Sequence, residues 1–435
     1  MSARLPRRRT QQRGLRLWPV GPVLALTFTV AVLVAAGVFY TGWELLGVRG
    51  LKPEHRIDSK TLFDLVKLSF GVVAGAGALV ALVVAYRRQR VDEDGALREA
   101  TRLHTERFTT AVGQLGEESA AVRLGAVHAL AGLADDAPDD SLRQTCVDVL
   151  CAYLQLPFTP DPGDDPAHQE EHHQYLAFRK VRHTILRLIG DHYRRPQGTH
   201  RSWQGCDLDL TGVTIDGDMD FEGARFSGGR VSFTDVTFAG GRVSFDRAVF
   251  SGGTVSFGHA VFSGGRVSFR GAVFSGGTVS FRGAVFSGST VSFYGAVFSG
   301  DAVLFDRATF SYGDVSFGDA GFSGGRVSFN DATFAGGAVS FLGATFSRGM
   351  ASFRRATFSS GVVFFDRVTF AGGTVSFVSA TFSSDAVSFR SVRFFGDGEV
   401  SFTDARGRAP SGLLDAVGTA SGPVVLPSTW LPLNP

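Results

Sequence analysis

Cysteine is scarce in this chain, whose 435 residues include only three: Cys146, Cys151 and Cys206. Three thiols exclude the disulfide framework that stabilises small secreted domains. Cys146 and Cys151 share one expected helix, and two thiols cannot by themselves form the usual tetrahedral zinc site. We therefore expect all three side chains to act as small buried hydrophobic groups in a reducing compartment.

The sequence also has neither a Walker loop nor an HExxH motif. Good metal ligands do gather in one Pro- and acid-rich segment, where the candidates are His168, Glu170, Glu171, His172 and His173. No rigid frame orients them, so we expect a solvated loop. His259 occupies a variable outward position and is expected to be an exposed surface residue without a catalytic role. The chain is predicted not to be an enzyme, with no catalytic, metal-binding or cofactor-binding residue and no cofactor.

An excess of one charge is missing as well, since 43 Lys and Arg face 41 Asp and Glu, a net charge of +2. Nucleic-acid binding depends on a basic surface that neutralises phosphates. The balance therefore argues against a nucleic-acid partner.

Two long uncharged stretches stand out at residues 18–40 and 68–86. Each is long enough to cross a bilayer core, which predicts two transmembrane helices. The apolar run of the first is too long for the usual signal peptide. Arginines gather within residues 1–17 and again directly after the second stretch. The positive-inside rule then places both flanks in the cytoplasm and the loop 41–67 outside.

Gly71 and Gly75 form a GxxxG pattern in the second stretch. Such a pattern permits close approach of two helices. The expected partner is the first transmembrane helix, and the alternative is the same helix of a second chain, which would give a homodimer.

Residues 91–200 are predicted to form a helical domain with a linker at 157–174. Apolar residues recur at helical spacing within 92–116. Ser119 is positioned to cap a second helix, Asp139 or Asp140 a third, and residues 176–193 read as a fourth.

From Phe226 to Phe394 the chain repeats every twelve residues, as in FSGGRVSFTDVT and FAGGRVSFDRAV. A short strict period is typical of a solenoid. Val, Phe and Ala alternate with polar residues, so they should face inward from short strands. The Phe rings of successive coils should then stack at about 4.8 Å, the strand spacing. Gly-x pairs such as Gly253-Thr254 fit tight corners, because Gly readily adopts a positive φ.

Units such as VSFRG and AVFSG, and the entry segment 208–217, resemble pentapeptide-repeat proteins over residues 203–406. The stretch 106–136 is similar to the HEAT-like helical pair that precedes pentapeptide repeats in many actinobacterial membrane proteins. The resemblance implies a right-handed four-sided β-helix with one pentapeptide on each side. Two twelve-residue units would fill one coil, giving roughly seven coils and ~34 Å of solenoid.

One coil for each twelve-residue unit is the rival arrangement. We favour the 24-residue coil, because two Phe, a Val and an Ala are too bulky for a twelve-residue ring. Trp203 is expected to cap the first coil. The tail 407–435, which contains Trp430, is expected to fold back over the last coil as a cap.

Some pentapeptide-repeat proteins mimic duplex DNA and bind type II topoisomerases, which requires an acidic surface. Asp and Arg are interleaved through this solenoid, so we keep that role only as the alternative. The sequence favours a non-enzymatic scaffold in a bacterial plasma membrane. Its helical domain and β-helix would lie in the cytoplasm and bind an unidentified protein partner.

Overall fold

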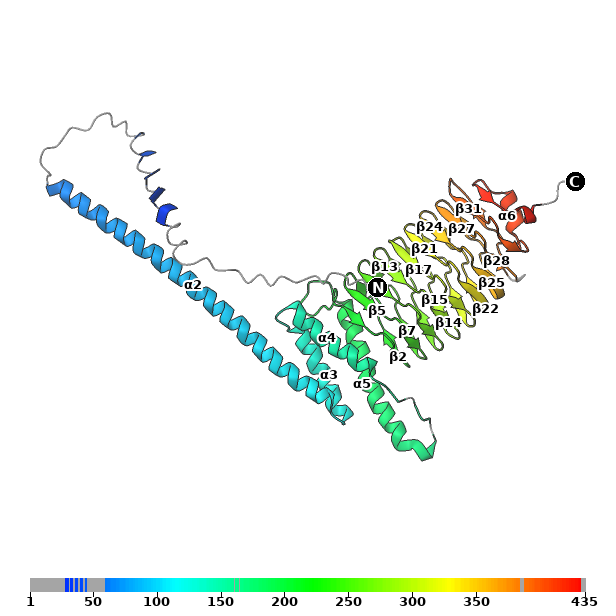
Figure 1. Ribbon diagram of the computed structural model, residues 1–435, viewed down its shortest axis with the longest axis horizontal. Coiled ribbons are helices and arrows are strands. Elements are labelled where there is room, and N and C mark those ends of the chain that lie inside the picture. Colours follow the sequence, from blue (N-terminus) through cyan, green and yellow to red (C-terminus); the bar gives the residue numbers. More distant parts are fainter. Residues whose placement is uncertain are drawn as a thin grey trace, which may run out of the picture. The chain divides into compact units, whose positions relative to one another are not determined.

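The computed structural model describes residues 28–30, 32–33, 36–37, 40–41, 44, 59–159, 161–163, 165–383 and 387–431. The chain divides into two compact units, residues 1–101 and 102–435 (Figure 1). The predicted N-terminus 1–17 and most of the predicted helix 18–40 and loop 41–67 lie outside the described residues.

Helix α2 (Ser59–Leu115) runs without a break for 57 residues. Its part Val66–Leu115 contains an 18-residue window with a mean hydropathy of 2.3, which is long and apolar enough to cross a membrane by length and composition. It is the one such helix in the described part of the chain, so the structure supports one candidate span and leaves the predicted pair unestablished. The helix expected within 92–116 is its continuation rather than a separate element.

A small helical region follows, made of α3 (Ala120–Asp135), α4 (Asp140–Gln155), the short 3-10 helix η1 (Pro166–His168) and α5 (Gln169–Arg194). Asp139 caps α4, since its carboxylate accepts a hydrogen bond from the Leu142 amide at 2.9 Å. Ser119 occupies the corresponding position before α3 without a side-chain capping bond. The α5 helix begins at Gln169, inside the predicted linker and before the predicted start at residue 176.

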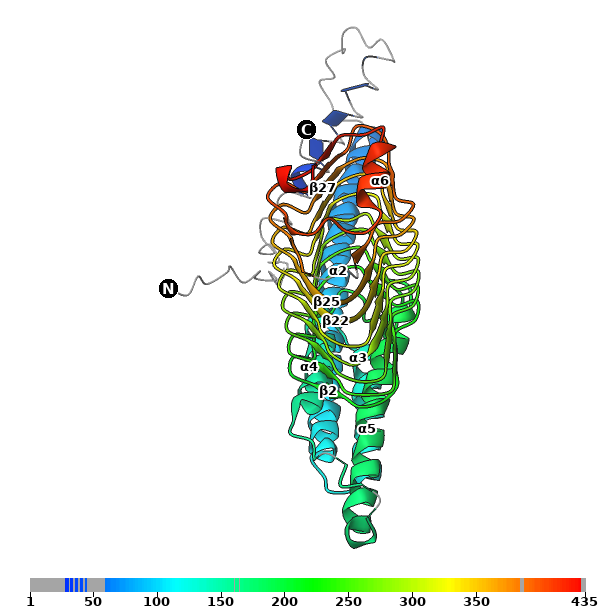
Figure 2. The same ribbon diagram turned by 90° about the vertical axis from the view of Figure 1, so that its right-hand side faces the viewer.

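The rest of the chain is a right-handed-type β-solenoid of about nine turns with four short strands in each turn (Figures 1 and 2). Val231 pairs with Val255 in the next turn, and Val249 with Val273. The 24-residue coil is therefore confirmed over the twelve-residue rival. The predicted seven turns were too few, because strands pair from Leu208 to Val425, beyond the counted Phe repeats.

The strands belong to three parallel sheets. The ten-stranded sheet contains β1 (Leu208–Asp209), β5 (Arg230–Ser232), β9 (Thr254–Ser256), β13 (Thr278–Ser280), β17 (Ala302–Leu304), β21 (Arg326–Ser328), β24 (Met350–Ser352), β27 (Thr374–Ser376), β31 (Glu399–Ser401) and β33 (Val424–Val425). The eight-stranded sheet contains β4 (Arg225–Phe226), β8 (Val249–Phe250), β12 (Val273–Phe274), β16 (Val297–Phe298), β20 (Gly321–Phe322), β23 (Thr345–Phe346), β26 (Thr369–Phe370) and β30 (Arg393–Phe394).

The fifteen-stranded sheet covers the two remaining sides of the coil, which the long strands β22 and β25 join. It contains β2 (Thr214–Ile215), β3 (Met219–Asp220), β6 (Thr237–Phe238), β7 (Arg242–Ser244), β10 (Val261–Phe262), β11 (Arg266–Ser268), β14 (Val285–Phe286), β15 (Thr290–Ser292), β18 (Thr309–Phe310), β19 (Asp314–Ser316), β22 (Thr333–Ser340), β25 (Thr357–Phe364), β28 (Thr381–Phe382), β29 (Val387–Ser388) and β32 (Arg406–Gly407).

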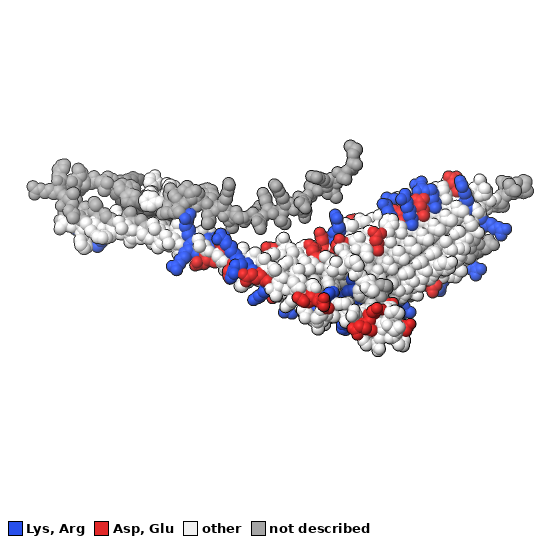
Figure 3. All heavy atoms as spheres, turned by 60° about the horizontal axis from the view of Figure 1, so that its bottom comes forward, with Lys and Arg blue, Asp and Glu red and all other residues white. Residues whose placement is uncertain are grey.

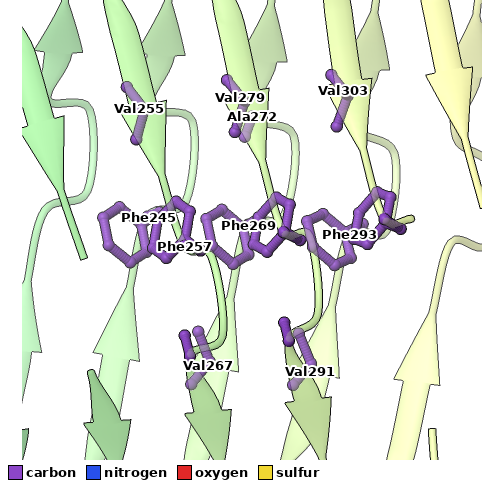
Figure 4. Close-up of a cluster of buried hydrophobic side chains, with 14 of the residues drawn as sticks. Phe245, Val255, Phe257, Val267, Phe269, Ala272, Val279, Val291, Phe293 and Val303 are labelled. Atoms are coloured by element: carbon purple, nitrogen blue, oxygen red, sulfur yellow. The ribbon is translucent and has the colours of Figure 1, made fainter. Parts of the chain in front are cut away.

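Columns of stacked Phe rings fill the solenoid (Figure 4). Phe245 stacks on Phe269 with ring centroids 4.8 Å apart, and Phe233 stacks on Phe257 at the same distance. These values confirm the spacing predicted from strand geometry. The two columns also touch each other edge to face, as Phe245 does with Phe257 at 5.6 Å. Stacked and edge contacts are both favourable aromatic geometries, so each ring is held by several neighbours.

The N-terminal end of the solenoid is covered differently from the prediction. Tyr193 of α5 lies on Phe226, with centroids 5.2 Å apart, and is fully buried. Trp203 instead stacks on His192 at 4.1 Å, and its indole N–H donates to Asp135 at 3.1 Å. The expectation that Trp203 caps the Phe columns was wrong, because α5 supplies the covering ring and Trp203 joins α5 to α3.

The tail covers the other end. Trp430, in the 3-10 helix η2 (Ser428–Trp430), lies 5.7 Å from Phe382 and 5.8 Å from Phe402 between ring centroids. Its indole N–H donates to the Gly407 carbonyl at 2.8 Å. A short helix, α6 (Leu413–Gly418), buries Leu413 beside it. The last Phe rings are thereby shielded from water.

Candidate functional site

Each coil contains two Gly corners at which neighbouring coils approach backbone to backbone. Gly253 has a φ of 71°, and a Cβ placed on it would lie 2.2 Å from the Gly229 carbonyl oxygen of the preceding coil. At Gly265 the corresponding distance to Gly241 is 2.3 Å. The sequence predicted the positive φ. The close approach is a second reason for Gly at Gly253 and Gly265, while Ser289 and Asp301 occupy the same position of the repeat with a φ that is not positive.

Each coil also contains two turns of a second kind, here called variable turns. In one of them the Ala248 amide donates to the Phe245 carbonyl at 3.0 Å, and Arg247 has a φ of 55°. Eleven non-Gly residues of the described chain have positive φ, and all occupy this position of the repeat, His259 among them. A Cβ added to Gly295, at the same position, would meet no atom within 4 Å. Most of these turns therefore accept a side chain that tolerates the left-handed backbone, whereas a Cβ on Gly283 or Gly343 would meet the side chain of His259 or Asp319 in the preceding coil.

The variable turns align into two ridges along the solenoid. Ridge one comprises residues 234–235, 258–259, 282–283, 306–307, 330–331, 354–355 and 378–379, and ridge two comprises 222–223, 246–247, 270–271, 294–295, 318–319, 342–343, 366–367 and 390–391. Figure 3 shows charged side chains gathered along one edge of the solenoid beside a broad uncharged surface. The ridges thus carry many of the charged residues of the solenoid, while others such as Arg230, Arg242 and Asp314 lie beside the Gly corners.

Opposite charges meet along both ridges. Ion pairs join neighbouring coils between Arg247 and Glu222, between Arg282 and Asp306 at 3.2 Å, and between Arg355 and Asp331 at 2.7 Å. The hydrogen bond from Arg355 lowers the pKa of Asp331. Exposed pairs of this kind contribute little stability. Their main effect is to leave the ridges without a continuous field of one sign.

Ridge two also carries an exposed cluster of Tyr294, Arg270 and Asp319. The Tyr294 hydroxyl donates to Asp319 at 2.5 Å, and the Arg270 guanidinium lies 5.4 Å from the Tyr294 ring centroid. Hydrogen bonding to Asp319 raises the pKa of Tyr294. Tyr and Arg are the residue types most often found at protein-binding hot spots.

Several ridge carboxylates serve the solenoid itself. Asp366 accepts hydrogen bonds from the Ser388 hydroxyl at 2.5 Å and from the Arg390 amide at 2.9 Å, both in the next coil. Asp246 accepts the equivalent bonds from Ser268 and from the Arg270 amide. These carboxylates connect successive coils, so part of their hydrogen-bonding capacity is used within the solenoid.

A polar cluster connects α5 to the first coil. Asp216 accepts hydrogen bonds from the Tyr175 hydroxyl at 2.5 Å, from Arg179 Nε at 3.1 Å and from His183 Nε2 at 3.1 Å. Burial opposes ionisation, but the bonds from His183 and Tyr175 and the charge of Arg179 together hold the pKa of Asp216 well below its usual value. Burial and the bond to Asp216 raise the pKa of Tyr175 to about 12. This cluster was missed in the sequence, since its members are far apart along the chain.

The candidate metal ligands do not form a centre. Residues 168–172 also fit the H-x-x-E-H spacing of some zinc proteases. However, His168 precedes α5, and His172 Nδ1 contacts the carboxylate of Asp161 at 2.7 Å. No group of three or more metal-ligating side chains occurs in the part of the chain that the structure describes.

The remaining reactive groups also occupy structural positions. Residues 321–325 read Gly-Phe-Ser-Gly-Gly, which fits the G-x-S-x-G spacing, but Ser323 is an exposed residue at a Gly corner rather than on a strand-to-helix elbow. All three cysteines are free thiols. Burial raises the pKa of Cys146 and of Cys206 to about 11 and that of Cys151 to about 12, which makes each a weak nucleophile.

Comparison with protein families agrees with the geometry. Residues 240–285 and 281–333 match the model "Pentapeptide repeats (9 copies)". Neither the curated proteins nor the solved structures gave a match. The solenoid of this chain is therefore built from pentapeptide repeats, a type of repeat that is generally structural or interaction-forming rather than enzymatic.

Proposed function

We propose that this protein is a membrane-anchored, non-enzymatic scaffold whose two ridges bind a protein partner. The observation that carries the proposal is the division of the solenoid surface. The inward Phe positions and corners such as Gly253 are constrained by packing, whereas the variable turns hold residues as different as Arg247, His259 and Ser379. A rigid rod with variable side chains at regular intervals is well suited to protein recognition, because it is ordered before binding.

Membrane anchoring is the second part of the proposal, and the apolar part of α2 supports it. The positive-inside rule places the helical region and the solenoid in the bacterial cytoplasm. Gly71 and Gly75 remain the proposed site of close helix approach, within one chain or in a homodimer.

The DNA-mimic alternative is disfavoured by the ridges. Mimicry needs carboxylates displayed as a continuous acidic surface. Here Asp306 and Asp331 pair with arginines, and Asp246 and Asp366 connect coils.

Site-specific photo-crosslinking in living cells tests partner binding. A benzophenone amino acid replaces Tyr294 on ridge two or, as a matched control, Tyr312 at a Gly corner, which is 71% exposed. We expect a discrete crosslinked protein from the Tyr294 position and none from the Tyr312 position. Equal products from both positions, or no product from either, would contradict recognition through this ridge.

Topology is tested by labelling intact cells with a membrane-impermeant maleimide. Lys60→Cys lies in the predicted external loop, and Thr254→Cys lies on the exposed solenoid surface. We expect labelling of the first variant only. Labelling of Thr254→Cys in unbroken cells would reverse the proposed orientation.

A further inference from the structure

A cavity in the helical region is lined by two arginines that have no carboxylate partner among the residues that the structure describes. Its volume is about 500 Å³, and it lies among α3, α4, α5 and the segment after α4. Arg123 and Arg182 line it together with Tyr153, Phe158, Tyr175 and Phe178. Among the described residues, no carboxylate oxygen lies within ion-pairing distance of either guanidinium.

Arg182 is the more deeply buried of the two, with 6% of its surface exposed. Its guanidinium donates to the backbone carbonyls of Leu154 at 2.8 Å and Thr214 at 3.3 Å and lies 4.6 Å from the Phe158 ring centroid. Burial lowers the pKa of Arg182, which reflects the cost of keeping this charge away from water. Carbonyls and an aromatic face offset only part of that cost.

Arg123 of α3 also lines the cavity, and its Nε donates to the Glu117 carbonyl. Its guanidinium lies 4.5 Å from the Phe178 ring centroid and donates to the Tyr153 hydroxyl at 3.2 Å. A guanidinium has more N–H donors than these contacts use, and its planar edge suits an oxyanion. The cavity thus combines two cations with aromatic walls.

A second cavity of similar volume shares segment 156–158, Arg182 and Tyr175 with the first. Asp161 and Asp216 also line that cavity, so its lining is less favourable to an anion. In the first cavity, Glu171 is the acid among the lining residues, and its side chain is exposed to solvent. The charge pattern therefore singles out the first cavity.

We propose that the first cavity binds an organic anion made of a carboxylate or phosphate on a flat apolar ring. The oxyanion would lie between Arg123 and Arg182, and the ring would pack against the aromatic walls. This site is independent of the ridges and of the proposed scaffold role.

Isothermal titration of the full-length protein in nonionic detergent tests the proposal. Phenyl phosphate and benzoate are the probes, while inorganic phosphate and phenol carry only the charge or only the ring. We expect saturable binding of at least one probe with a Kd below about 1 mM and weaker binding of both comparators. The two probes distinguish a phosphate ligand from a carboxylate ligand. No saturable binding of either, or equal binding of phenol, would overturn the proposal.

Variants locate the binding. Arg123→Gln should weaken the affinity by about ten- to hundred-fold, because a charged hydrogen bond is lost. Arg187→Gln removes an exposed α5 arginine paired with Asp191 and should change the affinity less than about two-fold. Thr159→Trp should block the cavity without touching either arginine, which keeps the test decisive if Arg123→Gln folds poorly. Unchanged binding in both Arg123→Gln and Thr159→Trp would place the anion elsewhere.

Discussion

Removing one ring from the middle of the solenoid should destabilise the protein more than removing one near its end. Phe269 is fully buried, stacks on Phe245 and Phe293 at 4.8 Å, and touches Phe257 and Phe281 edge to face at 5.6 and 5.7 Å. A buried Phe→Ala change typically costs ~3–5 kcal/mol. A fifth ring, Phe274, lies 6.4 Å away. Because five aromatic contacts are lost together, we expect Phe269→Ala to cost about 5 kcal/mol, the top of that range.

Phe394 in the last turns supplies the matched comparison. It is 3% exposed, and its one ring partner among the described residues is Phe370 at 5.3 Å. In a solenoid each coil is stabilised by its neighbours, so Phe394→Ala should cost about 3 kcal/mol. The difference of about 2 kcal/mol between the two variants is the quantity to be tested.

Urea unfolding of the full-length protein in detergent, followed by far-UV circular dichroism, gives the two costs. Hydrogen exchange with mass spectrometry should show faster opening in peptides within one or two coils of residue 269. Ser323→Ala, at an exposed Gly corner, serves as the neutral control. A cost below about 2 kcal/mol for Phe269→Ala, or equal costs for the two Phe variants, would refute the argument from ring contacts.

Three further predictions concern the turns, the junction and the thiols. Gly253→Ala should cost well over 2 kcal/mol in urea unfolding, because its Cβ would lie 2.2 Å from a carbonyl oxygen, while Gly295→Ala should cost only about 1 kcal/mol for its left-handed backbone. Equal costs would show that the positive φ, rather than the close approach of the preceding coil, determines the loss of stability. Asp216→Asn should cost about 2 kcal/mol at pH 7, since charged hydrogen bonds are weakened. Folding lowers the pKa of Asp216, so its contribution to the free energy of unfolding is present above the unfolded pKa of about 4 and is lost as the pH falls toward the folded pKa. The difference in unfolding free energy between wild type and Asp216→Asn should therefore be smaller at pH 3 than at pH 7. An equal difference at both pH values would contradict this linkage. Iodoacetamide at pH 8 should alkylate the three thiols slowly in the native protein and fully after denaturation, because burial raises every thiol pKa. Rapid native alkylation of Cys146 or Cys151 would show that α4, which contains both, opens in the native protein.

Much of the solenoid could be predicted because its information is local and repeated. The spacing of Phe233, Phe245 and Phe257 gives both the strand pattern and the stacking distance. Core volume was enough to choose a 24-residue coil. The turn count was too low because the first coil departs from the Phe consensus, with Leu210 and Ile215 buried at positions that Phe233 and Phe238 occupy in the next coil.

The junction could not be predicted, since it depends on pairings between distant residues. Nothing local links Tyr175 to Asp216 or Arg182 to the Thr214 carbonyl. The prediction that Trp203, rather than Tyr193, covers the first Phe ring failed for the same reason. Both are large aromatic residues near the entry coil, and the direction of α5 decides which one faces the Phe column.

The two kinds of turn explain why the repeat reveals the fold so clearly and the function so poorly. A side chain at Gly253 would collide with the preceding coil, so packing dictates that position. At Arg247 or His259 the backbone is left-handed but the residue is exposed, so core packing dictates little. Positions free of packing constraints are those at which selection for a partner can act. The information that specifies a partner should therefore lie in the two ridges, and exchanging ridge residues between coils should alter binding while the Phe columns preserve the fold.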